Sequence, residues 1–200
     1  MTRLEEAEQK YGQLFGWIAT PDQHFLVEFL PIIAKEFSNP PRIVEVGTFY
    51  GSTARGLMAL TGGTCTSMDN WKDFHPSDKY KTGEEAFWDT VKSNGVDLTD
   101  RARLIPGDSK EIGSRWQEPI DILFIDGDHS FAGALGDIQL FTPHIVSGGY
   151  CFVDDWDMPE VRRAVTDGFS LQEWETIRVP LDTTSKILVV RKKRMGEEGR

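Results

Sequence analysis

The sequence predicts an α/β protein built around a doubly wound, mostly parallel sheet. Strand-like and helix-like patterns alternate along the chain, and this alternation is typical of such sheets. The 200 residues, 39% of them hydrophobic, are enough for one α/β core. Neither a repeat nor a low-complexity linker interrupts the pattern. We therefore expect a single domain, with a helical cover over residues 1–40, a core over residues 41–192 and a tail over residues 193–200.

The first forty residues predict two helices. Thr20, Pro21 and Asp22 have the character of an N-cap, a first-turn proline and a first-turn acid at the start of the second helix. Pro31 is expected to kink that helix, and the Asn-Pro-Pro run at 39–41 ends it. The first helix is expected to cover a functional site or to form a dimer contact. Its apolar residues are Tyr11, Leu14, Phe15 and Trp17.

The rest of the chain alternates between strands and helices. A helix is expected over residues 54–60, and the segment 131–144 suits a right-handed crossover between parallel strands. The last two strands are joined by the short segment 180–185, which predicts an antiparallel hairpin at one edge of the sheet. The expected strands cover residues 42–46, 64–68, 102–105, 121–125, 149–153, 175–179 and 186–191.

Acidic side chains and a histidine follow two of these strands. Asp126, Asp128 and His129 come after one strand, and Asp154 and Asp155 come after the next. The carboxyl ends of parallel strands share one edge of a sheet, so these groups should converge there. Carboxylates crowded in a crevice raise one another's pKa values unless a cation neutralises them. Hard oxygen ligands of this kind favour Mg²⁺, with Mn²⁺ or Ca²⁺ as alternatives.

A glycine-rich turn joins the first strand to the next helix. Gly47 and Gly51 allow close backbone approach to a ligand, and the helix that starts near Thr53 offers free N–H groups to its anionic end. Phe49 stands where a dinucleotide-binding turn requires a second glycine. Asp69 ends the second strand, where a carboxylate accepts hydrogen bonds from ribose hydroxyls. The pattern suits a nucleoside with a small zwitterionic tail; the alternative is a tight turn whose glycines serve packing, with Asp69 as a cap.

Composition narrows the range of partners. A formal net charge of −10 argues against nucleic acid and favours a small neutral or cationic substrate. No apolar run reaches 18 residues and the N-terminus is polar, so we expect a cytoplasmic protein with no membrane partner. Cys65 and Cys151 fall inside apolar runs, without metal-ligand or redox spacing, and are expected to be core residues.

Taken in order, these motifs resemble the class I S-adenosylmethionine-dependent methyltransferases, and among them the metal-dependent O-methyltransferases. The nearest resemblance is to the small-molecule and sugar O-methyltransferases of antibiotic biosynthesis (macrocin O-methyltransferase type), with catechol O-methyltransferase more distant. It implies a Rossmann-like fold with a seven-stranded sheet of order 3-2-1-4-5-7-6, in which only strand 7 is antiparallel. The motifs that carry it are Glu45-x-Gly47-x-x-x-Gly51-x-Thr53, Asp69, Gly107-Asp108-Ser109, the Ile-Asp-Gly-Asp-His run at 125–129 and Asp154-Asp155.

The same resemblance implies roles for individual residues. Asp69 would bind the ribose of S-adenosylmethionine. The other residues implied at the cofactor are Glu45, Gly47, Gly51 and Thr53 at the turn and the methionine portion, Trp71 packed nearby, Asp108 and Ser109 on the adenine side, and Asp126 at the border with the metal. The implied metal ligands are Asp126, Asp154 and Asp155. The catechol enzyme has an asparagine where this chain has Asp155, and the extra charge should strengthen cation binding.

Two residues compete for the role of base in methyl transfer. Asp128 matches the position of the base in the sugar enzymes, and His129 matches the lysine base of the catechol enzyme. Either residue could instead cap the helix that opens near Ser130. The polar and aromatic segment 70–85 suits a lid over the acceptor or a subunit contact.

Other functions remain open at this point. A metal-dependent hydrolase could use the same acids, and a silent binding module could keep the fold. The acceptor atom could be oxygen or nitrogen, and a homodimer is possible.

Overall fold

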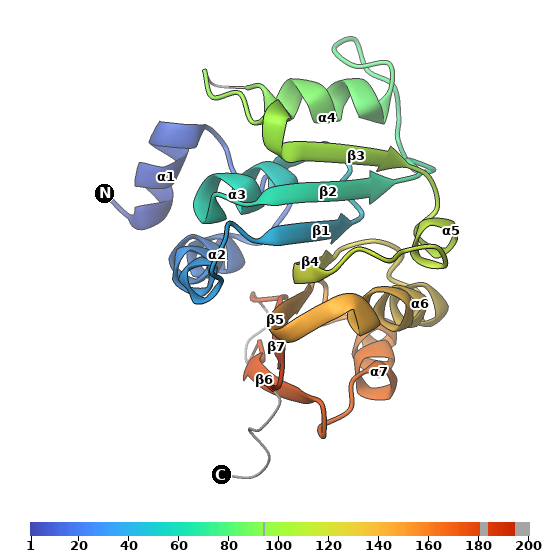
Figure 1. The fold of residues 1–200 in the computed structure, drawn as a ribbon. Helices are drawn as coiled ribbons and strands as arrows, with labels where there is room; N and C mark the ends of the chain where they lie inside the picture. The colour runs from blue at the N-terminus through green and yellow to red at the C-terminus, as the bar shows by residue number, and fades with distance from the viewer. Residues whose placement is uncertain (94, 181–183, 195–200) are drawn as a thin grey trace.

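The computed structural model describes residues 1–93, 95–180 and 184–194, which form a seven-stranded sheet with helices on both faces (Figure 1). The strand order is β3-β2-β1-β4-β5-β7-β6, and β7 is antiparallel to both of its neighbours. Both features confirm the expected sheet. The strands are β1 Arg42–Val46, β2 Thr64–Asp69, β3 Ala102–Pro106, β4 Ile120–Ile125, β5 Ile145–Val153, β6 Trp174–Arg178 and β7 Leu188–Lys192.

The sheet separates the hydrophobic core into two layers, each covered by helices. Helices α1 to α4 pack with one face of the sheet, and α6 and α7 pack with the other. Strand β4 is buried along its whole length because both faces are covered, as is usual for a central parallel strand. The helices are α1 Arg3–Tyr11, α2 Thr20–Ile33, α3 Ser52–Thr61, α4 Gly83–Val91, α5 Ser109–Gly113, α6 Phe131–Phe141 and α7 Pro159–Gly168.

The N-terminal segment differs from the expected helices. Helix α1 ends at Tyr11, because Gly12 takes a left-handed φ of 79° that stops the helix. Leu14 and Phe15 therefore lie in a loop, where both are completely buried, and Trp17 is 71% exposed. The placement of Tyr11 on the first helix is confirmed, whereas that of Leu14, Phe15 and Trp17 was wrong, although Leu14 and Phe15 do belong to the core.

The start of α2 also needs a correction. Ala19 is the N-cap and makes no side-chain cap hydrogen bond, so Thr20 is already helical. Asp22 is a first-turn acid as expected, and it is completely buried. One of its oxygens accepts from the Arg178 guanidinium at 2.6 Å, and the other accepts from the backbone N–H of Lys186 at 2.6 Å. The carboxylate thus ties α2 to β6 and to the residues that precede β7.

Arg55 on α3 is completely buried and joins the ends of two other helices. Among the described residues, its guanidinium donates hydrogen bonds to main-chain carbonyls rather than to a carboxylate. These acceptors belong to Tyr11, Thr90, Val91, Ser93 and Val96. A cation at the carboxyl ends of α1 and α4 satisfies carbonyls that have no partner within their own helices.

Backbone hydrogen bonds hold the first residue of the loops after β1, β3, β4 and β5 against a neighbouring strand. Gly47 donates its N–H to Met68 O at 2.9 Å, and Gly107 donates to Asp69 O at 2.9 Å. Asp126 and Asp154 donate to the last residues of β1 and β4, at 2.8 and 3.0 Å. The ladder of parallel hydrogen bonds thus continues one residue past the strands, and it fixes where the loops begin.

Some expected features lie outside the described residues. These are residues 181–183 of the connection between the last two strands and residues 195–200 of the tail; the hairpin pairing of β6 and β7 itself is observed. In the described parts of the chain, the helices are too short or too polar to cross a membrane.

Candidate active site

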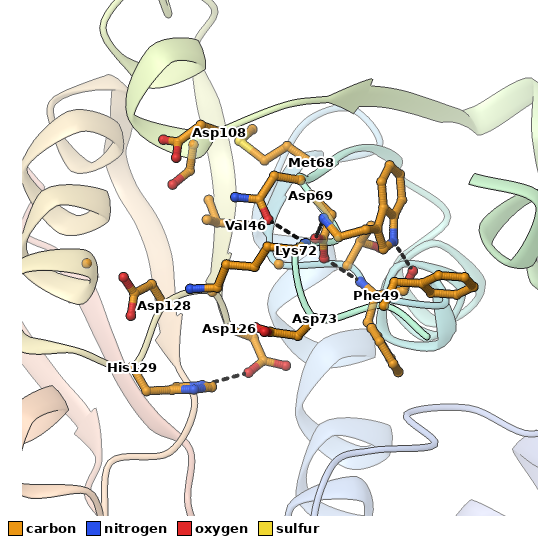
Figure 2. Close-up of a pocket in the computed structure, with 18 of the residues that line it drawn as sticks. Val46, Phe49, Met68, Asp69, Lys72, Asp73, Asp108, Asp126, Asp128 and His129 are labelled. Atoms are coloured by element: carbon orange, nitrogen blue, oxygen red, sulfur yellow. Dashed lines mark hydrogen bonds and ion pairs between the residues drawn. The ribbon is translucent and has the colours of Figure 1, made fainter. Parts of the chain in front are cut away.

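A cleft of about 680 Å³ opens at the carboxyl ends of β1 to β4, a volume that suits a small-molecule site (Figure 2). Its walls bring together most of the expected cofactor and base residues. Those in the lining are Gly47, Thr53, Asp69, Trp71, Asp108, Ser109, Asp126, Asp128 and His129. Those outside the lining are Glu45, Gly51, Asp154 and Asp155.

The two glycines of the turn serve different purposes. Gly47 has a φ of +82°, and a Cβ on it would lie 1.9 Å from the carbonyl oxygen of Asp126. The turn after β1 therefore packs directly on the backbone that follows β4. Gly51 has a φ of +79°, and its Cβ would lie 2.6 Å from the Phe87 ring. Gly51 thus makes room for this side chain of α4, and it does not line the cleft.

Asp69 holds the turn in shape from the end of β2. Its oxygens accept from the N–H groups of Phe49 at 2.8 Å and Trp71 at 2.6 Å (Figure 2). Both donors have left-handed backbones, with φ of 46° and 48°. The Trp71 indole N–H also donates to Phe49 O at 2.8 Å. Because an ionised carboxylate has about four acceptor sites, these two bonds leave lone pairs for a ligand. Asp69 can therefore cap the turn and still accept hydrogen bonds from ribose hydroxyls.

Glu45 lies buried beneath this turn. It is 0% exposed, and among the described residues neither carboxylate oxygen has a hydrogen-bond partner within bonding geometry. Burial raises the pKa of Glu45 to about 8, and the nearby hydroxyls of Thr48 and Ser67 offset only part of that rise. A buried acid of this kind is protonated over much of the neutral range.

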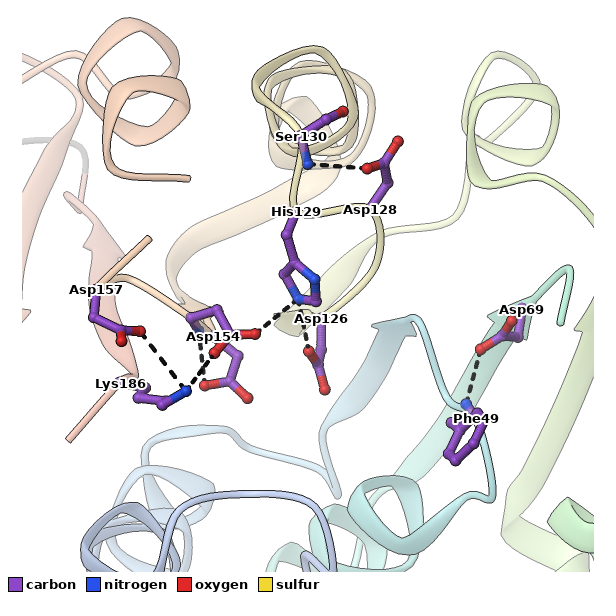
Figure 3. Close-up of polar contacts among 10 residues, drawn as sticks. Phe49, Asp69, Asp126, Asp128, His129, Ser130, Asp154, Asp157 and Lys186 are labelled. Carbon is purple, nitrogen blue, oxygen red and sulfur yellow. Dashed lines mark hydrogen bonds and ion pairs between the residues drawn. The ribbon is translucent and has the colours of Figure 1, made fainter. Parts of the chain in front are cut away.

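The acid cluster forms around His129 (Figure 3). Its Nε2 lies 3.0 Å from Asp155 Oδ2 and 3.4 Å from Asp126 Oδ1. One potential ligand atom from each of these three residues lies within 4.8 Å of the others. Lys186 Nζ approaches the second oxygen of Asp155 at 3.1 Å. Sequence reasoning missed Lys186, which reaches the cluster from the segment before β7.

Asp154, the other expected metal ligand, is directed differently. It is 7% exposed, and its Oδ1 accepts from the N–H of Asp155 at 2.9 Å. Asp155 has a φ of 52°, which turns the chain sharply between the two acids. Burial, followed by repulsion from Asp126, raises the pKa of Asp154 to about 8. Burial also raises the pKa of Asp126, and the contact with His129 offsets part of this effect.

Asp128 and His129 differ in their surroundings. Asp128 is exposed and accepts from the N–H of Ser130 at 2.9 Å, a bond that lowers the pKa of Asp128. The hydrogen bond to Asp126 raises the pKa of His129. The helix cap itself is Ser130, whose hydroxyl accepts from Gly133 N–H at 3.1 Å. Neither of the two candidate bases is therefore the N-cap of α6.

Five aromatic side chains contact one another beside the cleft, and three of them, Trp17, Phe49 and Phe74, line it. Trp17 meets Phe49 edge-on at 5.6 Å between centroids, and Phe49 stacks on Tyr50 at 4.1 Å. Tyr50 contacts Phe74 at 5.8 Å and Tyr80 at 6.0 Å. We call these five residues the aromatic rim. Two of them belong to the segment expected to form a lid, whereas sequence reasoning gave Phe49 and Tyr50 no such role.

This chain is similar to known methyltransferases in sequence and in fold. A family model described as a methyltransferase domain matches residues 44–156, more than half of the chain. The uncharacterized protein R132 of Acanthamoeba polyphaga mimivirus is 39% identical over 56 residues, a match that spans 24% of this chain and 25% of the viral protein. The matched segment is thus about a quarter of that curated relative's length.

Solved structures share the fold at low sequence identity. An O-methyltransferase from Bacillus cereus, solved in complex with S-adenosylhomocysteine (SAH), has a TM-score of 0.62 at 15% identity, covering 97% of this chain and 91% of that chain. An rRNA methylase from Streptococcus thermophilus has a TM-score of 0.60 at 13% identity, covering 84% and 96%. At such identities the likeness shows the fold alone. The family match covers more than half of the chain, so this chain belongs to the methyltransferase-domain family.

Proposed function

We propose that this enzyme methylates a hydroxyl group of a small molecule, and that a divalent cation at the acid cluster takes part. The observation that carries the proposal is the position of Asp126. Its backbone supports Gly47 of the turn, while its carboxylate lies within 4.8 Å of the ligand atoms of His129 and Asp155. A cofactor at the turn and an acceptor at the acids would thus be neighbours.

The cleft residues fit S-adenosylmethionine. Asp69 keeps lone pairs for the ribose hydroxyls after holding the turn. Thr53 and Gly47 would border the methionine portion, and Asp108 and Ser109 would face the adenine from the loop after β3. Glu45 does not line the cleft, so it would influence the cofactor indirectly, through the position of the turn.

The acid cluster fits a hard divalent cation. Asp126 and Asp155 offer carboxylate oxygens, and either His129 or Asp154 would complete the set. Burial is the main cause of the raised pKa values of Asp126 and Asp154, and repulsion from neighbouring acids adds to it, so a bound cation would stabilise the ionised carboxylates. When bound, a cation at this place would lower the pKa of an acceptor hydroxyl and hold its oxygen.

The chain's own residues would orient the acceptor and take its proton. Asp128 and His129 both line the cleft, and His129 also contacts Asp126 and Asp155 of the acid cluster. Asp128→Asn and His129→Gln separate these roles. Loss of the true base should lower turnover by about 10²–10⁴ while metal affinity in the Asp128 variant stays near that of the parent.

Charge and shape favour a small acceptor over RNA, although an rRNA methylase shares the fold. The protein carries a net charge of −10, and Asp69, Asp108, Asp126 and Asp128 line the cleft. Such walls repel phosphates, on which RNA affinity depends. The aromatic rim offers flat apolar contact, which suits a ring-containing acceptor.

Calorimetry and a methyl-transfer assay test the proposal. SAH should bind with and without chelator, with affinities within about tenfold, or 1.4 kcal/mol. Methyl transfer to a panel of phenols, catechols and sugars should stop in chelator and return with Mg²⁺ or Mn²⁺. Asp155→Asn should weaken metal binding, whereas Asp157→Asn should not, because Asp157 is not one of the clustered ligand residues among the described ones and approaches Lys186 at 3.9 Å.

Full activity in chelator would contradict the metal part of the proposal. Absence of SAH binding would contradict the cofactor part, and metal-supported hydrolysis without S-adenosylmethionine would favour a hydrolase that uses the same acids.

A further inference from the structure

A buried carboxylate lies behind the wall of the cleft. Asp137 on α6 is 1% exposed, and its Oδ1 accepts from the Ser109 hydroxyl at 2.6 Å. Its Oδ2 lies 3.1 Å from the place that a Cβ on Gly127 would occupy, and it has no hydrogen-bond partner among the described residues. A buried acid with so few partners lowers stability rather than raising it. The arrangement therefore points to a role at the neighbouring cleft.

The contact fixes the hydrogen-bonding character of Ser109. A serine hydroxyl has one proton to donate and two lone pairs that accept. Burial raises the pKa of Asp137 to about 6, so the group is ionised at pH 8 and can only accept. The Ser109 proton is then committed to Asp137. Ser109 lines the cleft, and towards a ligand there it can offer only lone pairs.

We propose that Asp137 is a positioning residue that makes Ser109 an obligate hydrogen-bond acceptor, and that this pair selects the amino group of adenine in the cofactor. The inference rests on the proposed placement of adenine beside Asp108 and Ser109. The exocyclic amine is the hydrogen-bond donor on the polar edges of adenine. Hypoxanthine has a carbonyl at that position, which would face the lone pairs of Ser109.

The test compares SAH with S-inosylhomocysteine, in which the amine is replaced by a carbonyl. Calorimetry at pH 8 on the full chain should show that the parent enzyme prefers SAH by at least about tenfold, equal to 1.4 kcal/mol. Asp137→Ala frees the Ser109 hydroxyl to rotate and donate, so the preference should fall below about threefold. Asp137→Asn still presents an oxygen to Ser109 and should keep most of the preference.

Two serine variants separate selection from packing. Ser109→Ala removes the acceptor at a partly exposed position and should also reduce the preference, so the test holds even if Asp137→Ala fails to fold. Ser114→Ala is the matched control, because that hydroxyl donates to Glu111 O at 2.8 Å just beyond α5 and should leave the preference unchanged. If Asp137 merely packs α6 against α5, both ligands should weaken equally.

A parent enzyme that binds the two ligands equally, or binds the inosyl ligand better, would overturn the inference while leaving SAH binding established. A preference that survives in both Asp137→Ala and Ser109→Ala would overturn it as well. If the parent binds neither ligand, the proposed cofactor site itself is wrong.

Discussion

Replacing Gly47 by alanine should damage the cofactor turn and the acid cluster together. The new Cβ would lie 1.9 Å from Asp126 O, whereas real Cβ contacts essentially never fall below 3.0 Å. The turn and the backbone after β4 would have to separate by about 1.1 Å. Neither side can yield cheaply, because Gly47 N–H bonds to Met68 O and Asp126 N–H bonds to Val46 O.

A displacement of that size should be costly for function. Misplacing reacting groups by about 1 Å can lower a rate by about 10²-fold, and we expect a loss of at least that order in methyl transfer. SAH affinity should fall by at least about tenfold, or 1.4 kcal/mol. The left-handed φ of +82° adds backbone strain of about 1–3 kcal/mol to the free energy of folding.

Gly62→Ala provides a control for the strain alone. Gly62 has a similar φ of +74°, and no atom among those described lies within 4 Å of its Cβ position. Urea unfolding, SAH calorimetry and turnover should be measured for both variants. The control should lose stability through strain but keep cofactor affinity and turnover. If Gly47→Ala binds SAH within twofold of the control, the contact with Asp126 does not shape the cofactor site and the reasoning is wrong.

Two further predictions concern stability. Glu45 has a folded pKa near 8 against an ordinary 4.5, so the unfolded chain ionises first and stability should fall as pH rises from about 4.5 to 8. Glu45→Gln should remove that part of the slope and be more stable than the parent at pH 8, with the two equal near pH 4.5 in urea titrations; an unchanged slope would refute this. Arg55→Met should lower the free energy of unfolding by about 3 kcal/mol or more, since it leaves several buried carbonyls unpaired. Arg103→Met, which breaks an exposed pair with Glu118, should cost less than about 1 kcal/mol, and equal losses in the two variants would contradict the role given to Arg55.

The sheet was predictable because its signals are local. The central strands β4 and β5 contain short runs rich in apolar residues, and the expected bounds of the strands differ from the observed ones by a few residues, most at the start of β5. The strand order came from the resemblance and not from periodicity. The N-terminal error arose because Leu14 and Phe15 are apolar at helical spacing. Gly12 was the signal that the helix had already ended.

The site was harder to predict because side-chain direction depends on contacts between distant residues. Asp154 and Asp155 are adjacent in sequence, but the left-handed backbone of Asp155 sends their carboxylates to different partners. Lys186 reaches Asp155 from 31 residues away, and Asp137 meets Ser109 across 28 residues. No local pattern reports such pairs, so the sequence located the acids without showing which of them share a centre.

Asp126 links the cofactor turn and the acid cluster through its backbone, whereas its side chain belongs to the acid cluster alone. Its carbonyl supports Gly47, whereas its carboxylate belongs to the cluster with His129 and Asp155. A backbone change at Gly47 should therefore reach both cofactor and acceptor. A change at Asp155, which does not touch the turn in the described contacts, should affect only the acceptor half. Comparing Gly47→Ala with Asp155→Asn for SAH affinity distinguishes the two routes: the first should weaken binding and the second should not. Equal losses would mean that the side chains of the cluster also shape the cofactor turn.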